Sequence, residues 1–224
     1  MKTILITGAN RGIGLEHARR FASRGVKVYA TARAPGDAPD LEALAREAEG
    51  RVVVLGYDAG KADAARALKA ELGDVALDLL FANAGVMGGK RQSFGSVDIE
   101  EAIDTLRVNA FAPLQLAETF ADNVAKSERK LMAFQSSLMG SVGDNGSGGY
   151  YGYRIAKAAL NMIAKGVSND LRGRGVIAVA LHPGWVQTRM GGASAPVTIE
   201  RCVEGQQGLL EGADARAERE ILQL

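Results

Sequence analysis

The chain has 224 residues, of which 47% are hydrophobic and 24% charged, and its formal net charge is +1. These values are typical of one globular domain that buries a core, and they give no indication of a nucleic-acid or other polyanionic partner. The single cysteine, Cys202, excludes an internal disulfide, and the apolar run near the N-terminus is too short for a signal peptide or a membrane span. We therefore predict a cytoplasmic protein without a membrane partner.

Short apolar segments rich in β-branched residues alternate along the chain with longer amphipathic segments. This alternation predicts a doubly wound parallel sheet with helices on both faces, an α/β fold of three layers in one domain spanning residues 1–224. The predicted strands are 2–7, 26–31, 51–56, 77–82, 130–136 and 176–181. The predicted helical segments are 13–24, 40–48, 61–72, 99–125, 152–172 and 199–211.

The segment TGANRGIG, residues 7–14, joins the first predicted strand to the first predicted helix. Its glycines, Gly8, Gly12 and Gly14, permit a positive φ and a close approach of the backbone to a ligand. The N-terminus of the following helix offers free N–H groups and the positive end of its dipole to an anion. The segment therefore predicts a loop that binds the pyrophosphate of a dinucleotide.

Five short motifs follow this glycine loop in chain order. They are ANAG (82–85), VNAF (108–111), QSSLMGS (135–141), a tyrosine and a lysine four residues apart (153 and 157), and HPGWVQT (182–188). With the T-G-x-x-x-G-x-G spacing of the loop, they resemble the short-chain dehydrogenase/reductase family over roughly residues 1–192, although the family commonly has Asn at Ala82. Within it, SLMGS, GGYYGYR and HPGWVQTRMGG are most similar to the Sniffer-like and C-factor-like carbonyl reductases.

The resemblance implies a Rossmann-type fold and an oxidoreductase that moves a hydride between a nicotinamide cofactor and a small carbonyl or secondary alcohol. Ser136 and Ser141 stay open as alternatives for the catalytic serine, because the loop GDNGSGG (143–149) lengthens the family's usual spacing to the tyrosine. The implied catalytic residues are Asn109, Ser137, Tyr153 and Lys157. The implied cofactor contacts are Gly8, Asn10, Arg11, Gly12, Ile13, Gly14, Arg33, Asp58, Ala59, Asn83, Ala84, Gly85, Tyr153, Lys157, Pro183, Gly184, Val186 and Thr188.

The end of the second predicted strand bears on the choice of cofactor. NAD-specific proteins place an acid there that bonds the ribose 2′-hydroxyl, whereas this chain has Thr31, Ala32 and Arg33. Arg11 lies within the glycine loop, and two guanidinium groups suit a ribose 2′-phosphate. We therefore predict NADP(H) in preference to NAD(H). The resemblance further implies that Asp58 bonds the adenine amino group.

Tyr153 and Lys157 lie one turn apart on the same face of a predicted helix. The ordinary tyrosine pKa of about 10 is high for an acid that works near neutrality. An ammonium group at ~4 Å interacts strongly enough to supply most of a reduction by ~3 units. We expect Lys157 to lower the pKa of Tyr153 and to hold the nicotinamide ribose. Ser137 is expected to bond the substrate oxygen, and Asn109 to complete a proton path through water.

Four side chains are expected to border the substrate: Met139, Tyr150, Trp185 and Met190, the last two within a substrate-binding segment at about 184–224. His182 is interpreted as a packing residue at a strand end, and His17 as a surface or packing residue of the first helix. No cluster of Cys, His and acidic residues predicts a metal site.

The C-terminal segment EGADARAEREILQL lacks the Gly- and Phe-rich closing strand of the family, and residues 220–224 fit either a short strand or the end of a helix. An edge strand left uncovered would pair with another chain, so we expect a homodimer or homotetramer. A different class of function stays open, that of a catalytically weak NADP(H)-binding sensor or signalling protein of the C-factor type. Such a protein would not need the catalytic set.

Overall fold

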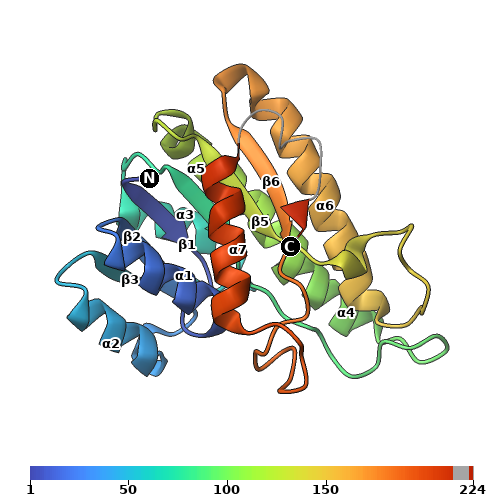
Figure 1. Ribbon diagram of the computed structural model, residues 1–224. Coiled ribbons are helices and arrows are strands. Elements are labelled where there is room, and N and C mark those ends of the chain that lie inside the picture. Colours follow the sequence, from blue (N-terminus) through green and yellow to red (C-terminus); the bar gives the residue numbers. More distant parts are fainter. Residues whose placement is uncertain (214–221, 224) are drawn as a thin grey trace.

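Figure 1 shows the protein as a computed structural model, which describes residues 1–213 and 222–223. Each predicted strand and helical segment has a counterpart within a few residues. The strands are β1 (Thr3–Ile6), β2 (Lys27–Ala32), β3 (Val52–Gly56), β4 (Leu79–Ala82), β5 (Leu131–Gln135), β6 (Ile177–His182) and β7 (Leu222–Gln223). The helices are α1 (Gly12–Ser23), α2 (Pro39–Glu47), α3 (Ala64–Leu72), α4 (Ile99–Leu106), α5 (Ala112–Ala125), α6 (Tyr151–Leu171) and α7 (Ile199–Gly212).

The strands form one parallel sheet in the order β3-β2-β1-β4-β5-β6-β7. The chain builds outward from β1 to β3 and then crosses to β4 on the other side, so the winding direction reverses between β1 and β4. Ligands of doubly wound sheets bind outside the carboxyl ends of the strands at such a reversal. Because the glycine loop 7–14 follows β1 directly, it lies at this point of the sheet.

Successive side chains of each strand enter two separate cores, as expected when both faces of a sheet are covered. In β1, Ile4 and Ile6 pack with residues of α1, α2 and α7, whereas Leu5 packs with residues of α3, α5 and α6. Figure 1 shows α7 crossing in front of the sheet. The predicted three-layer α/β fold is therefore confirmed.

The helical segment predicted at 99–125 is not one continuous α-helix. Helix α4 ends at Leu106, a π-turn covers Arg107–Phe111, and α5 begins at Ala112. Pro113 gives a physical reason, because it has no N–H to donate to the carbonyl of Asn109 four residues earlier. Single π-turns within helices are frequent at functional sites, and this one carries a predicted catalytic residue.

The C-terminal part of the sheet corrects one expectation. Strand β7 lies parallel to β6, with Leu181 opposite Leu222 and His182 opposite Gln223. The carboxyl end of β6 is therefore covered by β7, so the sheet edge is not left open at these two residues. Residues 214–221 and 224, which belong to the expected substrate-binding segment 184–224, lie outside the described residues.

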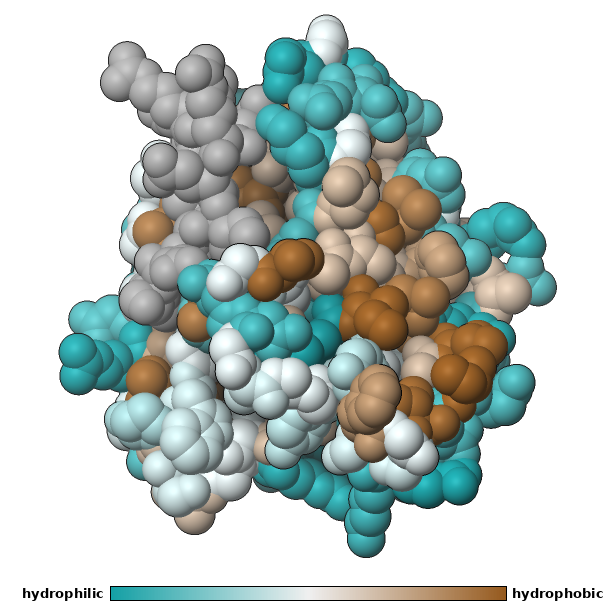
Figure 2. Space-filling model, turned by 90° about the vertical axis from the view of Figure 1, so that its right-hand side faces the viewer, coloured by the Kyte–Doolittle hydropathy of each residue, from teal (hydrophilic) through white to brown (hydrophobic). Residues whose placement is uncertain are grey.

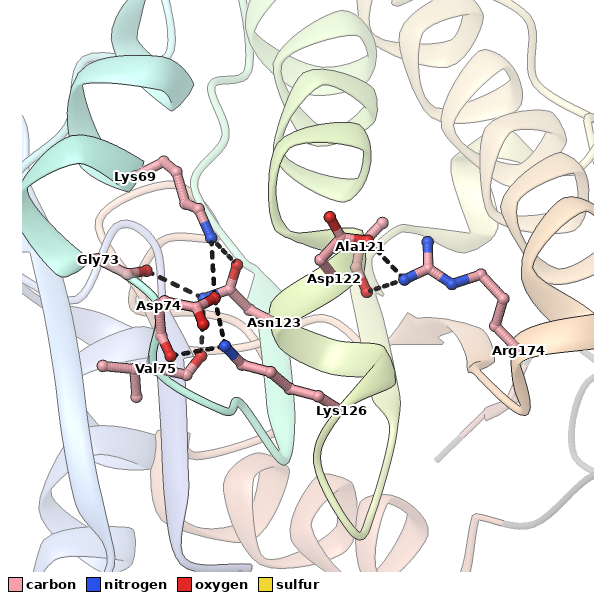
Figure 3. Close-up of polar contacts among 9 residues, drawn as sticks. All are labelled: Lys69, Gly73, Asp74, Val75, Ala121, Asp122, Asn123, Lys126 and Arg174. Atoms are coloured by element: carbon pink, nitrogen blue, oxygen red, sulfur yellow. Dashed lines mark hydrogen bonds and ion pairs between the residues drawn. The ribbon is translucent and has the colours of Figure 1, made fainter.

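A buried amide anchors α5 at the end of the sheet opposite the glycine loop (Figure 3). The Asn123 side chain is fully buried, donates to the carbonyls of Gly73 (3.1 Å) and Val75 (2.7 Å), and accepts from the Lys69 ammonium. The Asn123 carbonyl also accepts from the N–H of Leu77 (2.9 Å). These bonds join the loop before β4 to α5, and so fix the helix whose other end continues from the π-turn.

Candidate active site

The glycine loop has the conformation that its sequence predicts. Gly8 and Gly12 have φ of +67° and +58°, a region that side chains rarely adopt. A Cβ at Gly8 would lie 2.8 Å from the Cα of Ala84, and a Cβ at Gly14 would lie 2.5 Å from Nδ2 of Asn83. The glycines are therefore required by backbone geometry and by close packing against the segment that follows β4.

Asn83 and Thr7 lock this loop in place. The Asn83 amide donates to the carbonyls of Thr7 (2.9 Å) and Gly8 (3.1 Å). The Thr7 hydroxyl in turn accepts from the N–H groups of Asn83 and Ala84, each at 3.1 Å. The Asn83 amide nitrogen therefore holds the glycine loop in place.

The outer end of the loop is open and positively charged. Arg11 precedes α1 in an extended conformation, and no side chain caps the first turn of the helix. Arg11 and Arg33 are both exposed, and neither has an ion-pair partner within the described part of the chain. Asp58, half-buried at the end of β3, accepts from the N–H of Gly60 (3.0 Å) with one carboxylate oxygen.

At the carboxyl end of β5, Tyr153 meets Ser137. The Ser137 hydroxyl lies close enough to the Tyr153 phenol to lower its pKa, and Tyr153 is only 7% exposed. Gly140 explains the close approach of the turn that carries Ser137, because a Cβ there would lie 2.6 Å from the carbonyl carbon of Lys157. His182 supports the same turn, since its Nδ1 accepts from the N–H of Leu138 (3.1 Å).

The two other serines face elsewhere. Ser136 donates to Oδ1 of Asn161 (2.5 Å), and Ser141 accepts from the N–H of Asp144 (3.3 Å). Among the three candidates, the structure brings Ser137 to the phenol.

Lys157 lies one turn after Tyr153, with Nζ 5.7 Å from the centroid of the Tyr153 ring. Its ammonium is buried and donates to the carbonyl of Gln135 (2.6 Å), and burial lowers the pKa of Lys157 to about 8. The expected lowering of the Tyr153 pKa by Lys157 is not found. Burial raises the pKa of the Tyr153 phenol, and the hydrogen bond with Ser137 only opposes that rise.

Asn109 projects from the π-turn toward the segment after β4. Its side chain accepts from the N–H of Val86 and donates to the carbonyl of the same residue, both at 2.8 Å. Gly85 lies between the functional groups, because a Cβ there would be 3.1 Å from Oδ1 of Asn109 and 3.7 Å from Nζ of Lys157. The site therefore unites residues of four separate sequence motifs.

The segment after β6 completes the site. Pro183 precedes Gly184, which has a φ of +78°, and the chain then turns back so that Val186 bridges to Val197. A Cβ at Gly12 would lie 3.7 Å from the methyl group of Thr188, so this segment contacts the glycine loop. The first and last motifs of the sequence therefore lie side by side.

The predicted pocket residues are partly exposed. Tyr150 is 53%, Trp185 57% and Met190 45% exposed, and Met139 is half-buried in the turn that follows Ser137. The Trp185 indole N–H donates to the carbonyl of Gly191 (2.8 Å), which fixes its orientation.

Sequence reasoning missed two glutamines of the site. Gln135 receives the Lys157 ammonium on its main-chain carbonyl, and Gln92 receives the N–H of Tyr153 on its side chain (2.9 Å). Gln135 lies in a recognised motif, but Gln92 stands in none and carries no signal in the sequence.

Two kinds of feature are absent from the described residues. They contain no group of three or more His, Cys, Asp or Glu side chains placed to hold a metal ion. They also contain no helix long and apolar enough to cross a membrane.

The chain is similar to proteins of known class. It is 39% identical to the C-signal of Myxococcus xanthus over 136 residues, which cover 61% of this chain and 81% of that protein. The carbonyl reductase Sniffer of D. melanogaster has a TM-score of 0.91 at 31% identity, covering 100% of this chain and 96% of that one. A short-chain dehydrogenase/reductase structure from Burkholderia multivorans with bound NADP has a TM-score of 0.88 at 34% identity, covering 96% and 93%.

The profile of the family described as short chain dehydrogenase matches residues 2–196, which include the glycine loop, the Ser137–Tyr153 pair and the Pro183–Gly184 segment. The chain therefore belongs to the short-chain dehydrogenase/reductase family of oxidoreductases.

Proposed function

We propose that the protein is an NADPH-dependent reductase of small carbonyl compounds, which also oxidises the corresponding secondary alcohols in reverse. The observation that carries this proposal is the buried Tyr153 phenol beside the Ser137 hydroxyl, with the buried Lys157 one turn away. The similarity to a carbonyl reductase at 31% identity over the whole chain supports it.

The catalytic roles follow from the chemistry of these side chains. Bound NADPH would supply the hydride, and the carbonyl oxygen would then need a proton. The Tyr153 phenol is protonated at neutral pH, which is the form that a general acid requires, although burial raises its pKa and so makes it a weaker acid. Ser137 would donate a hydrogen bond to the oxygen on which negative charge develops.

Lys157 and Asn109 have supporting roles in the proposal. The Lys157 ammonium would bond the nicotinamide ribose and resupply the proton of Tyr153. Pro113 leaves the Asn109 carbonyl without the N–H donor that an α-helix would provide. That carbonyl would hold the water through which the proton reaches Lys157.

The preference for NADPH over NADH rests on charge at the adenosine end. Arg11 and Arg33 are exposed and without ion-pair partners among the described residues, and β2 ends without an acid. A 2′-phosphate would accept charge-assisted hydrogen bonds from both. The NADP bound to a similar protein at 34% identity supports the same choice.

The test is the oxidation of NADPH followed at 340 nm with a panel of quinones, isatin and related diketones, and aldehydes, together with NADPH binding measured by calorimetry. We expect turnover of at least one carbonyl class. NADPH binding without turnover of any compound would reject the enzyme in favour of an NADP(H)-binding sensor. That second function is favoured by the 39% identity to the C-signal, whereas the complete catalytic set favours the enzyme.

We also propose that the protein self-associates as a homodimer or homotetramer. Large hydrophobic side chains are exposed on α4, the π-turn and α6, and Figure 2 shows hydrophobic groups on that face of the molecule. They are Ile99, Ile103, Phe111, Ile155 and Met162.

Sedimentation velocity tests this self-association and should give a multiple of the mass of one chain. Met162→Glu should reduce that mass, whereas Val142→Glu, in the loop before α6, should not; a wild-type monomer would contradict the proposal.

A further inference from the structure

Gln92 is a buried residue in a segment of exposed ones. It lies between β4 and α4, where its neighbours Arg91 and Ser93 are exposed, yet Gln92 itself is only 7% exposed. Its amide nitrogen donates to the carbonyls of Met87 (3.0 Å) and Gly89 (2.8 Å). Its amide oxygen accepts from the N–H of Tyr153 (2.9 Å), so every polar group of the side chain is engaged.

The N-terminus of α6 explains why this contact matters. Tyr150, which precedes the helix, has a φ of +50° and supplies no capping side chain. The first N–H groups of a helix have no partners within the helix, and burying them unpaired is costly. Gln92 supplies two partners from a distant part of the chain: its main-chain carbonyl accepts from Tyr151 (3.1 Å), and its side chain accepts from Tyr153.

Close packing leaves little freedom for the first turn of α6. A Cβ at Gly152 would lie 3.2 Å from the Cα of Ala102 on α4 and 3.3 Å from Oε1 of Gln92. Helix α4 and Gln92 therefore both contact the turn that carries Tyr153, and a change in the position of Gln92 would be transmitted to the phenol.

The same segment is tied to Asn109. The Asn109 amide holds both main-chain groups of Val86, and the Gln92 amide holds the carbonyls of Met87 and Gly89. Residues 86–92 thus form a strap, held at one end by the π-turn and at the other by α6. This strap fixes the distance between the elements that carry two of the proposed catalytic groups.

From these contacts we propose that Gln92 is a positioning residue that holds Tyr153 in its productive place by capping α6 from the strap 86–92. The proposal rests on the proposed function, in which Tyr153 is the proton donor.

The chain offers a matched control in Asn123. Like Gln92, Asn123 is a buried amide that donates to two main-chain carbonyls of one loop, but it lies at the opposite end of the sheet and its oxygen accepts from Lys69 (Figure 3). Gln92→Met and Asn123→Leu each remove all side-chain hydrogen bonds and keep similar volume. Both should lower the melting temperature, so stability alone cannot separate the two roles.

The experiment compares turnover of isatin with NADPH, NADPH affinity by calorimetry, and hydrogen exchange of the Tyr153 amide. For Gln92→Met we expect kcat to fall by about 10²-fold, as for a small misplacement of a catalytic group, with NADPH affinity retained. The Tyr153 amide should exchange faster in Gln92→Met than in Asn123→Leu, and Asn123→Leu should keep the wild-type kcat. Gln92→Glu retains an acceptor for this N–H but loses the donor to the Met87 and Gly89 carbonyls, so the Tyr153 amide should exchange at a rate between those of wild type and Gln92→Met. Its carboxylate should shift the pH profile of kcat to higher pH, because negative charge disfavours the phenolate.

The exchange measurement does not depend on turnover. If the wild-type protein reduces no carbonyl, the proposed function fails, and exchange still reports whether Gln92 caps Tyr153. Equal exchange of the Tyr153 amide in Gln92→Met and Asn123→Leu would overturn the proposal. So would a kcat of Gln92→Met within about threefold of an active wild type, a difference below 1 kcal/mol in barrier.

Discussion

Three tyrosines stand within four residues at the start of α6, and their surroundings differ. Tyr153 is buried beside the Ser137 hydroxyl, whereas Tyr150 is 53% exposed and Tyr151 is 36% exposed. A proton donor must reach the reacting oxygen from a fixed position. Of the three tyrosines, only Tyr153 is both buried in a fixed position and adjacent to another proposed catalytic residue.

Replacement of Tyr153 by phenylalanine should remove the proton donor and leave the fold intact. We expect kcat for carbonyl reduction to fall by about 10²–10⁴-fold, the usual contribution of general acid catalysis. NADPH affinity, measured by calorimetry, should change little. Tyr150→Phe and Tyr151→Phe are the matched controls and should retain most activity. An active Tyr153→Phe protein would show that a different group donates the proton.

The buried ammonium of Lys157 should make stability depend on alkaline pH. Burial lowers its pKa from 10.5 to about 8 in the folded state. Between these values the unfolded chain holds a proton that the folded chain has released, so stability rises with pH across this window. Urea unfolding at pH 8, 9 and 10 should show wild type gaining stability relative to Lys157→Met. An equal change in the free energy of unfolding with pH in the two proteins would contradict the burial of a titrating amine at Lys157.

Among single residues, the sequence predicts those whose partners lie within the same motif. Tyr153 and Lys157 are paired by helical spacing alone, and the alternation of side chains along a strand favours Ser137 over Ser136 without excluding Ser136. Gln92 could not be predicted, because its partner Tyr153 is far away in sequence and the contact exists only once α6 has packed. The raised pKa of Tyr153 was also missed, because the spacing to Lys157 says nothing about how deeply the phenol is buried.

In the proposed function, the elements around the glycine loop would set the specificity for the dinucleotide. Gly8, Gly12 and Gly14 shape the loop between β1 and α1, but they would contact groups common to both nicotinamide cofactors. Arg11 before α1 and Arg33 after β2 are the side chains that would bind a 2′-phosphate. Discrimination between NADPH and NADH would therefore depend on the ends of two elements and not on the glycines.

Arg33→Ala should weaken NADPH selectively. A hydrogen bond to a charged group contributes about 1.5–3 kcal/mol, so we expect kcat/KM for NADPH to fall by about 10-fold or more. The kcat/KM for NADH should stay nearly constant. Arg11→Ala should show the same selective loss of kcat/KM for NADPH. Arg46→Ala, an exposed arginine of α2, is the control. A wild-type preference for NADH, or equal losses for both cofactors, would contradict the assignment.

Element boundaries were predictable where side-chain periodicity is strong and unpredictable where the backbone departs from one regular form. The sequence marks α4 and α5 as one helical segment because a π-turn leaves the apolar pattern nearly unchanged. Pro113 was the available signal, since it removes the donor for the Asn109 carbonyl. The short β7 has no such signal, because two residues carry no periodicity, and it is defined by its pairing with β6.

At the scale of the whole molecule, the order of strands and the two cores follow from the alternation of strands and helices, since parallel strands need crossovers of one hand. The polar contacts between the layers cannot be predicted from this alternation. His17 on α1 donates from Nε2 to Oε1 of Gln206 on α7 (3.0 Å), and Gln206 donates to Oε1 of Gln135 on β5 (3.0 Å). This chain of buried groups joins two helices to the strand that receives the Lys157 ammonium.

The buried His17 should make the molecule sensitive to acid. Burial lowers its pKa from 6.5 to about 4, against the opposing effect of the bond to Gln206. Between pH 6.5 and 4 the unfolded chain takes up a proton that the folded chain does not, so stability falls as pH falls through this window. In His17→Gln, which keeps a hydrogen-bond donor but does not titrate, this loss should be smaller.

Urea unfolding midpoints of both proteins at pH 7, 6, 5 and 4 give the comparison, in which the carboxylates shared by the two chains cancel. We expect the midpoints to converge as pH falls, because wild type loses the contribution of neutral His17 and the variant has none to lose. A constant separation between the two curves would mean that His17 binds its proton equally in the folded and unfolded states. The contact between α1 and α7 would then have to tolerate a charge within the core.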